Sequence, residues 1–290
     1  MIEEQKFYWT LLDTLKDGVY FANKQRKITY WNKAAEAITG YKNNEMLGRF
    51  CGDNLLIHID EEGNSLCKGP CPLTRTMDTG EAYEEKIYLH HKDGHRVPVF
   101  VRTTPVYGSN DEIIGAVEIF TDLSAREALT NIRALDEPDL LSSLSGLPTR
   151  QCLEMNLKLK FFEWEEFQHV FGVFHIKING FEEVKNTIGQ EAAEEVVKTL
   201  SQTLIHNITP GDMIGEWGEG EFLGVAGYGD EARLSFTANH YRHLLENTEL
   251  SHISKADAAV SISFSVGTAL VREGDTIEKL LERAWAAPTP

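Results

Sequence analysis

The stretch that decides the fold of the first half is GVYFANKQRKITYWNKAAEAITG, residues 18–40. Two runs in it, 18–23 and 27–31, are rich in β-branched and aromatic residues, and the polar turn 24–26 separates them. Such a pattern is typical of two short strands joined by a tight turn. These residues are therefore predicted to form a pair of short strands.

A short helix and three longer strands follow this pair. Asn32 is a residue type that caps helices and Gly40 one that ends them, so residues 33–39 are predicted to be helical. Three strand-like runs separated by turn sequences come later, at 83–90, 96–107 and 113–120. Helices between an early strand pair and a late antiparallel meander predict an α+β domain with one sheet.

The pattern changes after a polar connecting segment. Ala125, Leu129 and Ile132 recur at helical spacing there, so a linker helix is predicted before Pro138. Long helices and strands then alternate, which predicts a second domain of α/β type with a central sheet flanked by helices. Its predicted elements are helix 150–164, strand 170–178, helix 191–204, hairpin 213–217 with 221–226, helix 232–246, strand 260–270 and a last helix from 276.

Composition excludes several classes of function. The 290 residues carry a formal net charge of −17, from 45 acidic and 28 basic residues, so the surface repels nucleic acid and anionic lipid. No run approaches the roughly 20 apolar residues that span a bilayer, and the N-terminus lacks a basic leader pattern. We expect a cytoplasmic protein without a membrane segment, with its four cysteines reduced or bound to metal.

The first domain resembles a PAS domain over about residues 8–122. The resemblance rests on DGVYFAN at 17–23, ITYWNKAA at 28–35, the KDG turn at 92–94 and GAVEIFTD at 115–122. PAS domains are sensor and dimerisation modules built on a five-stranded antiparallel sheet with short helices. The resemblance therefore implies a sensing role, but the fold alone does not identify the ligand.

A cluster of sulfur and imidazole groups stands out within this domain. It comprises Cys51, His58, Cys67 and Cys71. Thiolates and imidazole suit zinc or an iron–sulfur cluster. Two other interpretations stay open. Cys67 and Cys71 are a redox-sensitive pair, or the thiols are buried and structural, with Cys71 preceding a helix at 73–78 that starts on proline. Cys152, in the second domain, is interpreted as a core residue, and His90, His91 and His95 as solvated residues of an exposed hairpin.

The second domain resembles GGDEF domains over about residues 142–287. The matching segments are LSGLPTR at 144–150, KINGF at 177–181, GQ at 189–190, GEGEF at 218–222 and SVG at 265–267. Active members of this family condense two GTP molecules into cyclic di-GMP across a dimer. That reaction needs Mg²⁺ held by carboxylates.

Several positions depart from the family pattern. Lys177 replaces the first metal-binding aspartate of the family pattern, and Gly220 replaces a catalytic carboxylate. Glu219 replaces the second glycine of the name motif. Of the carboxylates that the family uses at this site, Glu221 remains. The arginine of the inhibitory R-x-x-D motif is absent from residues 209–212. The basic segment that grips phosphate has no counterpart before Pro290. We therefore expect no Mg²⁺ in this domain.

The altered positions suggest a different arrangement of charges. Lys177 and Glu221 are predicted to approach each other, so that an ammonium–carboxylate pair replaces the metal. Lys185 stands where the family has a guanine-binding asparagine, whereas Glu194 replaces the later aspartate and Gly218 keeps the first glycine of the name motif. Gly218 and Glu194 are thus candidates for retained nucleotide contacts.

These inferences predict a signalling protein with a PAS sensor at 1–122, a linker helix at 123–141 and a degenerate GGDEF domain at 142–290. The PAS domain would sense a small ligand, metal or redox state, and the second domain would serve regulation, dimerisation or nucleotide binding. The alternative is a weak or atypical diguanylate cyclase that uses Glu219 and Glu221. A homodimer is expected, with a protein partner or a small molecule, GTP or cyclic di-GMP included, as ligand.

Overall fold

The chain divides into two compact units, Met1–Ser124 and Ala125–Pro290. A computed structural model describes residues 2–53, 55–124, 138–227, 230–251, 253 and 262–286. Most of the predicted linker helix, residues 125–137, lies outside the described residues, and the boundaries placed at 122 and 141 stay predictions. The described part of the second unit begins with a 3-10 turn, η1 (Pro138–Leu140).

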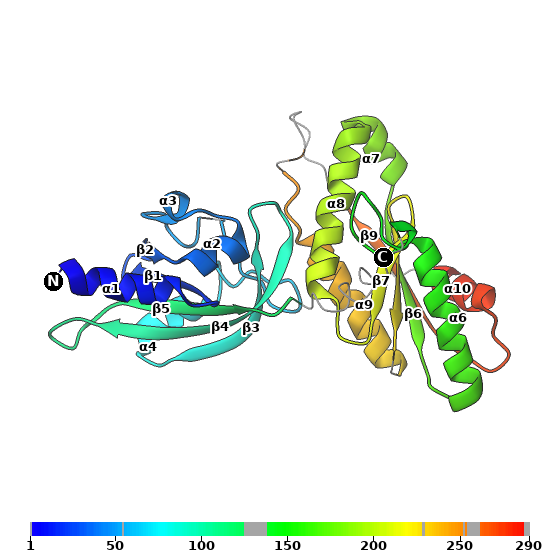
Figure 1. Cartoon of the computed structure of the whole chain (residues 1–290), viewed down its shortest axis with the longest axis horizontal. Helices are drawn as coiled ribbons and strands as arrows, with labels where there is room; N and C mark the ends of the chain where they lie inside the picture. The colour runs from blue at the N-terminus through cyan, green and yellow to red at the C-terminus, as the bar shows by residue number, and fades with distance from the viewer. Residues whose placement is uncertain are drawn as a thin grey trace. The chain divides into compact units, whose positions relative to one another are not determined.

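A five-stranded antiparallel sheet forms the frame of the first unit (Figure 1). Its order is β2-β1-β5-β4-β3, with bounds β1 (Gly18–Asn23), β2 (Ile28–Trp31), β3 (Tyr83–His90), β4 (Arg96–Tyr107) and β5 (Ile113–Asp122). The predicted strand pair and the predicted meander are both confirmed. They form one sheet because β1 pairs along the whole of its length with β5.

Four helices accompany this sheet, α1 (Ile2–Asp13), α2 (Lys33–Thr39), α3 (Asn43–Met46) and α4 (Pro72–Thr79). The start and the end of α2 are those predicted. The Asn32 side chain accepts a hydrogen bond from the Ala35 backbone N–H at 2.8 Å, and Gly40 adopts φ +76° at the C-terminal end. Both groups satisfy backbone polar atoms that the helix ends leave free.

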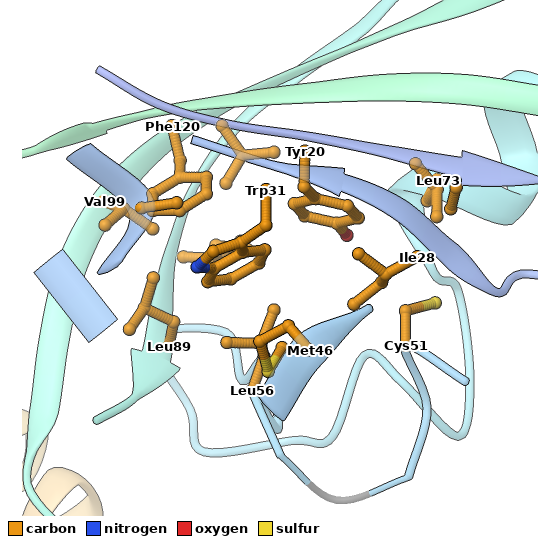
Figure 2. Packing of buried hydrophobic residues seen from close by; sticks show 14 of the residues in the cluster. Tyr20, Ile28, Trp31, Met46, Cys51, Leu56, Leu73, Leu89, Val99 and Phe120 are labelled. Atoms are coloured by element: carbon orange, nitrogen blue, oxygen red, sulfur yellow. The ribbon is translucent and has the colours of Figure 1, made fainter. Parts of the chain in front are cut away.

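The core of the first unit lies between the sheet and its helices and loops. Figure 2 shows the rings of Tyr20, Trp31 and Phe120 close together, with Met46 and Leu56 facing them from the connecting segments. The Tyr20 and Trp31 ring centroids are 5.6 Å apart. Cys51 lies in the same cluster, so the predicted metal ligands reach into the interior of the domain.

The second unit has a four-stranded sheet between two layers of helices (Figure 1). All strand pairs are antiparallel, in the order β7-β8-β6-β9. The elements are α6 (Arg150–Phe167), β6 (Gly172–Ile178), α7 (Phe181–Ile188), α8 (Gln190–Asn207), β7 (Met213–Gly218), β8 (Glu221–Ala226), α9 (Glu231–Glu246), β9 (Phe264–Leu270) and α10 (Ile277–Ala286). The predicted central sheet flanked by helices is confirmed.

The two faces of this sheet bury different sets of side chains. Phe174 and Ile176 of β6 pack in the cluster with α8 and α9, whereas Val173 packs with α6 and α10. Because side chains alternate along a strand, His175 and Lys177 point to the same side as Val173. This alternation places the lysine that replaces a metal ligand on the α6–α10 face.

The structure differs from the predicted elements in several places. Helices α1, α3 and α7 were not predicted, and β9 begins at Phe264, after two described residues of the predicted strand that are not in a strand. Of the large apolar side chains described along α1, Phe7, Tyr8, Trp9 and Leu11 are exposed and Leu12 is half-buried. Within the described residues, no helix combines the length and the apolar character that crossing a membrane requires.

Candidate functional site

The hairpin of β7 and β8 presents the name-motif residues of the second unit. Glu219 and Gly220 form its turn, with Gly220 at φ +67°. A Cβ atom at Gly220 would lie 2.7 Å from the Phe181 ring, so α7 packs directly against the turn. A side chain is therefore excluded here unless the ring of Phe181 moves.

Lys177 and Glu221 form the ion pair that the sequence predicted. They lie opposite each other in the β6–β8 register, and Lys177 Nζ is 2.8 Å from Glu221 Oε1. His175 Nε2 is 3.4 Å from the other carboxylate oxygen. Burial alone would raise the pKa of Glu221, but Lys177 and His175 hold this pKa below its ordinary value. Glu221 is therefore a carboxylate already engaged by two basic groups.

Lys185 and Glu219 form a second ion pair across the site. Lys185 Nζ is 2.6 Å from Glu219 Oε2 and 3.0 Å from Glu182 Oε1. The two acids raise the pKa of Lys185, and Lys185 in turn lowers the pKa of Glu219. Both members of this pair replace uncharged residues of the family pattern. The positive charge of Lys185 and the negative charge of Glu219 therefore neutralise each other.

The candidate nucleotide contacts line one cavity of about 240 Å³. Gly218 and Glu194 both face it, together with Glu219, Gly220 and Lys185. Glu194 is fixed there by Gln190, whose side chain donates a hydrogen bond to Glu194 Oε1 at 2.7 Å. The remaining lining residues are Leu144, Phe181, Gln190, Ala193, Val197, Glu216 and Phe222.

A second cavity, of about 540 Å³, lies on the α6–α10 face beside the Lys177–Glu221 pair. It also contains His175, Trp217 and Trp285, which the sequence argument did not single out. Arg150 also lines this cavity, and its guanidinium lies 4.5 Å from the centroid of the Trp217 ring. His175 precedes Lys177 by two strand positions, so the period of the strand was a signal that could have identified it.

The Mg²⁺ that the family implies does not fit the residues present. Lys177 places an ammonium group on the carboxylate that would bind the ion, and Gly220 offers no donor. Among the residues that the structure describes, no group of three His, Cys, Asp or Glu side chains is arranged to hold a metal ion.

Two of the four predicted metal ligands of the first unit, Cys51 and Cys71, contact one arginine, and no three of the four are arranged to hold a metal ion. Arg26 donates hydrogen bonds from Nε to Cys51 Sγ at 3.4 Å and from Nη2 to Cys71 Sγ at 3.5 Å. The backbone N–H of His58 donates to Cys67 Sγ at 3.3 Å. All the cysteines of the chain are free thiols. Burial raises the pKa of Cys51 and Cys67 to about 11, against the opposing effect of their hydrogen-bond donors.

A buried carboxyl group completes this cluster. Tyr20 donates a hydrogen bond to Glu118 Oε2 at 3.0 Å, and His58 Nε2 lies 3.7 Å from Glu118 Oε1, an oxygen that has no hydrogen-bond partner within the described part of the chain. Burial raises the pKa of Glu118 to about 7 and lowers the pKa of His58 to about 4, with Arg96 and Arg26 adding to the second effect. Tyr20, Arg26 and Glu118 were not singled out in the sequence, because the residues that they contact lie 25 to 98 positions away along the chain and give no local signal.

The interpretation of three histidines as solvated is wrong. His90 and His95 are buried, and the ring centroids of His91 and His95 are stacked 4.2 Å apart. The hairpin is covered by neighbouring segments, since His90 Nδ1 lies 3.0 Å from the Leu55 carbonyl oxygen and Lys92 donates its backbone N–H to Thr39. The buried position of Cys152, in contrast, is as predicted.

Comparison with known families gives an identity to both units. A model described as the diguanylate cyclase GGDEF domain matches residues 141–287, and a PAS-domain model matches residues 16–125. The chain therefore belongs to the GGDEF-domain family, with a PAS domain ahead of the GGDEF domain. It is a PAS–GGDEF signalling protein related to diguanylate cyclases.

Among curated relatives, the probable diguanylate cyclase DgcE of Escherichia coli K12 is 23% identical over 226 residues, 77% of this chain and 20% of DgcE. Diguanylate cyclase DosC of the same strain is 28% identical over 112 residues, 39% of this chain and 24% of DosC. The histidine kinase AtoS is 28% identical over 141 residues, 47% of this chain and 21% of AtoS. The chain thus spans about a fifth to a quarter of the length of these relatives.

Solved structures align with parts of the chain at low identity. The GGDEF domain of DgcB from Caulobacter crescentus, in complex with c-di-GMP, aligns with TM-score 0.48 and 19% identity over 52% of this chain and 85% of that one. A PAS domain from Colwellia psychrerythraea aligns with TM-score 0.36 and 24% identity, over 42% and 98%.

Proposed function

We propose that the PAS domain senses a small ligand, metal ion or redox state, and that the GGDEF domain is a regulatory, dimerisation or nucleotide-binding module without cyclase activity. The observation that carries this proposal is the Lys177–Glu221 ion pair at 2.8 Å. It occupies the place where the family resemblance puts a metal-binding carboxylate pair.

The chemistry of cyclic di-GMP synthesis explains why this pair matters. Attack of a ribose hydroxyl on an α-phosphate needs divalent cations that bridge carboxylates and phosphate oxygens. An ammonium group cannot coordinate a cation, and it repels one from the remaining carboxylate. A GGDEF domain with Lys177 at this position therefore lacks the means to bring the metal to the reacting phosphate.

The second ion pair supports the same proposal. Lys185 bridges Glu219 and Glu182 over the cavity where the resemblance places guanine. A nucleotide that enters this cavity has to compete with that bridge. The negative charge of Glu219 at the hairpin turn also opposes the approach of phosphate.

The proposal is tested by incubating the purified chain with GTP and either Mg²⁺ or Mn²⁺ and measuring cyclic di-GMP by chromatography. We expect no product above a sample without protein. Sustained turnover would overturn the proposal in favour of an atypical cyclase that uses Glu219 and Glu221.

A second candidate, a nucleotide receptor without catalysis, is favoured by the cavity of about 240 Å³ that Glu194 and Gly218 line. A carboxylate in this place can accept two hydrogen bonds from the guanine ring. Calorimetric titration with GTP and with cyclic di-GMP tests it, with Glu194→Gln as the variant that should lose binding. Binding that Glu194→Gln leaves unchanged would exclude this cavity as the receptor site.

Homodimer formation, a protein partner and a cytoplasmic location are part of the same proposal. They rest on the resemblance to sensor modules and on the net charge of −17.

A further inference from the structure

We propose that helix α6 of the GGDEF domain pairs with the same helix of a second copy of this chain, antiparallel and around a two-fold axis close to Phe162. The inference rests on the dimerisation role proposed above and names the surface that performs it. Its basis is an exposed apolar stripe on a helix whose other apolar side is already buried, together with the charges along the edge of that stripe.

Helix α6 carries apolar side chains on two sides. One side, which includes Leu153 and Leu157, is part of the hydrophobic core that α6 shares with α10. The other side carries Met155, Leu159 and Phe162, which are 53%, 53% and 54% exposed. These three residues follow one another at spacings of four and three, so they form one stripe along the helix. A contiguous apolar surface of this kind marks an interaction site.

Two charges along one edge of this stripe favour a second copy as the partner. Lys158 and Glu165 are exposed and seven residues apart, which is two helical turns, so they lie on the same edge. About 10 Å of helix separates them, too far for an ion pair within one chain. The other two basic residues of α6 pair with acids of the same helix. Among the residues that the structure describes, neither Lys158 nor Glu165 has an ion-pair partner.

An antiparallel pairing joins these two charges between copies. A two-fold axis that crosses the pair at right angles brings the same edge of both stripes together and sets residues at equal distances from the axis level with each other. With the axis midway between Lys158 and Glu165, each Lys158 lies level with the partner's Glu165. Phe162 then meets its own counterpart at the centre of the contact. A parallel pairing brings opposite edges together and leaves Lys158 and Glu165 apart.

The local charge permits this contact although the whole chain is acidic. With a formal net charge of −17, two copies repel each other over most of their surface. Helix α6 itself has three basic and four acidic residues, so it is close to neutral. An apolar and nearly neutral helix is therefore a surface at which self-association meets little opposition.

The pairing suits a domain that regulates and does not catalyse. Arg150 begins α6 and lines the cavity beside the Lys177–Glu221 pair. Each Arg150 stands 11.5 residues from the axis, so the two copies of Arg150 lie about 35 Å apart along the helices. Joining two nucleotides across a dimer requires the two sites to face each other closely. The α6 pairing instead holds them apart.

The test follows self-association of the full chain by sedimentation equilibrium over a wide range of protein concentration. One helix per copy buries less than the ~800 Å² per partner of a stable interface, so we expect a monomer–dimer equilibrium. Lys158→Glu and Glu165→Lys should each raise the dimer dissociation constant about 10-fold, and the double reversal should restore it. Because the two positions are too far apart to pair within one helix, this rescue reports a contact between copies.

Phe162→Ser should also raise the dissociation constant, by at least ~10-fold. Phe236→Ser is the matched control, since Phe236 is 61% exposed on α9, in the layer on the other face of the sheet, and its loss should leave the constant unchanged. Circular dichroism checks that each variant is folded. A wild type that stays monomeric, equal effects of the two serine variants, or a double reversal without rescue would overturn the inference.

Cross-linking tests the register without relying on affinity. Under mild oxidation Phe162→Cys should join two chains, because residue 162 lies beside the axis. Met155→Cys should not, because its counterpart is 13 residues away along the pair, about 20 Å, and a disulfide cannot span that distance. The wild type, with its four cysteines, is the control for disulfides of other origin. Cross-linking of both variants, or of neither, would contradict the antiparallel pairing.

These outcomes separate the inference from the proposed function. A dimer without the cross-link at position 162 overturns the α6 pairing and leaves the regulatory role in place. Cyclic di-GMP formation overturns the inactive GGDEF domain and leaves the cross-linking result unaffected.

Discussion

At the scale of single residues, Gly220 shows how the hairpin of the GGDEF domain differs from the family pattern. The pattern has a carboxylate at this position. In this chain the backbone is left-handed, with φ +67°, and the Phe181 ring occupies the space that a side chain would fill. The loss of the carboxylate and the closeness of α7 to the turn are therefore one structural feature.

We predict that Gly220→Ala destabilises the GGDEF unit more than Gly274→Ala does. Both glycines have a positive φ, of 67° and 76°, but an added Cβ at Gly274 meets nothing within 4 Å. Gly274→Ala therefore measures the cost of the backbone strain alone. In Gly220→Ala the clash with Phe181 lowers the free energy of unfolding by about 1–3 kcal/mol more. Urea unfolding of both variants measures the difference, and equal losses would contradict the prediction.

His175 gives a pH dependence whose sign follows from its burial. Burial lowers the pKa of His175, Lys177 acts in the same direction and Glu221 opposes both. A group whose pKa is lower in the folded state contributes stability above its unfolded pKa of about 6.5, and this stability is lost as the pH falls below that value.

We therefore expect the free energy of unfolding to decrease between about pH 7 and pH 5 more steeply in the wild type than in His175→Gln. Glutamine removes the titrating group and keeps a polar side chain beside Glu221. Chemical unfolding at several pH values measures both slopes. Parallel curves for the two proteins would show that His175 titrates alike in the folded and unfolded states.

At the scale of elements, Asn32 connects α1, β1 and α2 of the PAS domain. Its side-chain oxygen accepts hydrogen bonds from the backbone N–H groups of Val19 and Ala35. Its side-chain amide nitrogen donates hydrogen bonds to the backbone carbonyl oxygens of Leu12 and Asp17. The side chain is completely buried. The sequence indicated the cap of α2, but not the bonds to Leu12 and Asp17, because these depend on where the chain returns in space.

We predict that Asn32→Ala destabilises the PAS unit by about 2–4 kcal/mol, because several buried backbone groups lose their partner. Thr149→Ala is the matched control, since Thr149 caps α6 through the hydrogen bond from Cys152 N at 3.4 Å and should cost about 1 kcal/mol. Hydrogen exchange at Val19 and Ala35 should accelerate in Asn32→Ala and remain unchanged in Thr149→Ala. Unchanged protection in both variants would disprove a structural role for the Asn32 amide.

At the scale of the whole molecule, each unit has its own hydrophobic core. The cluster of Tyr20, Trp31 and Phe120 lies within the first unit, and two clusters on either face of the second sheet lie within the second. A core that is complete within one segment allows that segment to fold alone.

We predict that a fragment of residues 1–124 folds cooperatively by itself. Circular dichroism should show mixed helix and strand content, and urea should unfold the fragment in a single transition. Non-cooperative unfolding would mean that the first unit needs the second for its stability.

The sequence by itself determined the two families and most of the elements, helices α1, α3 and α7 excepted, because turn residues, caps and strand alternation act over a few residues. It also indicated the Lys177–Glu221 pair, since the family pattern places those two positions opposite each other. Only the tertiary structure decided which distant side chains meet. Arg26 contacts Cys51 and Cys71, Glu118 faces His58, Lys185 bridges to Glu219, and His90 and His95 are buried. Each of these contacts joins segments that lie far apart in the chain, and no local pattern encodes such a meeting.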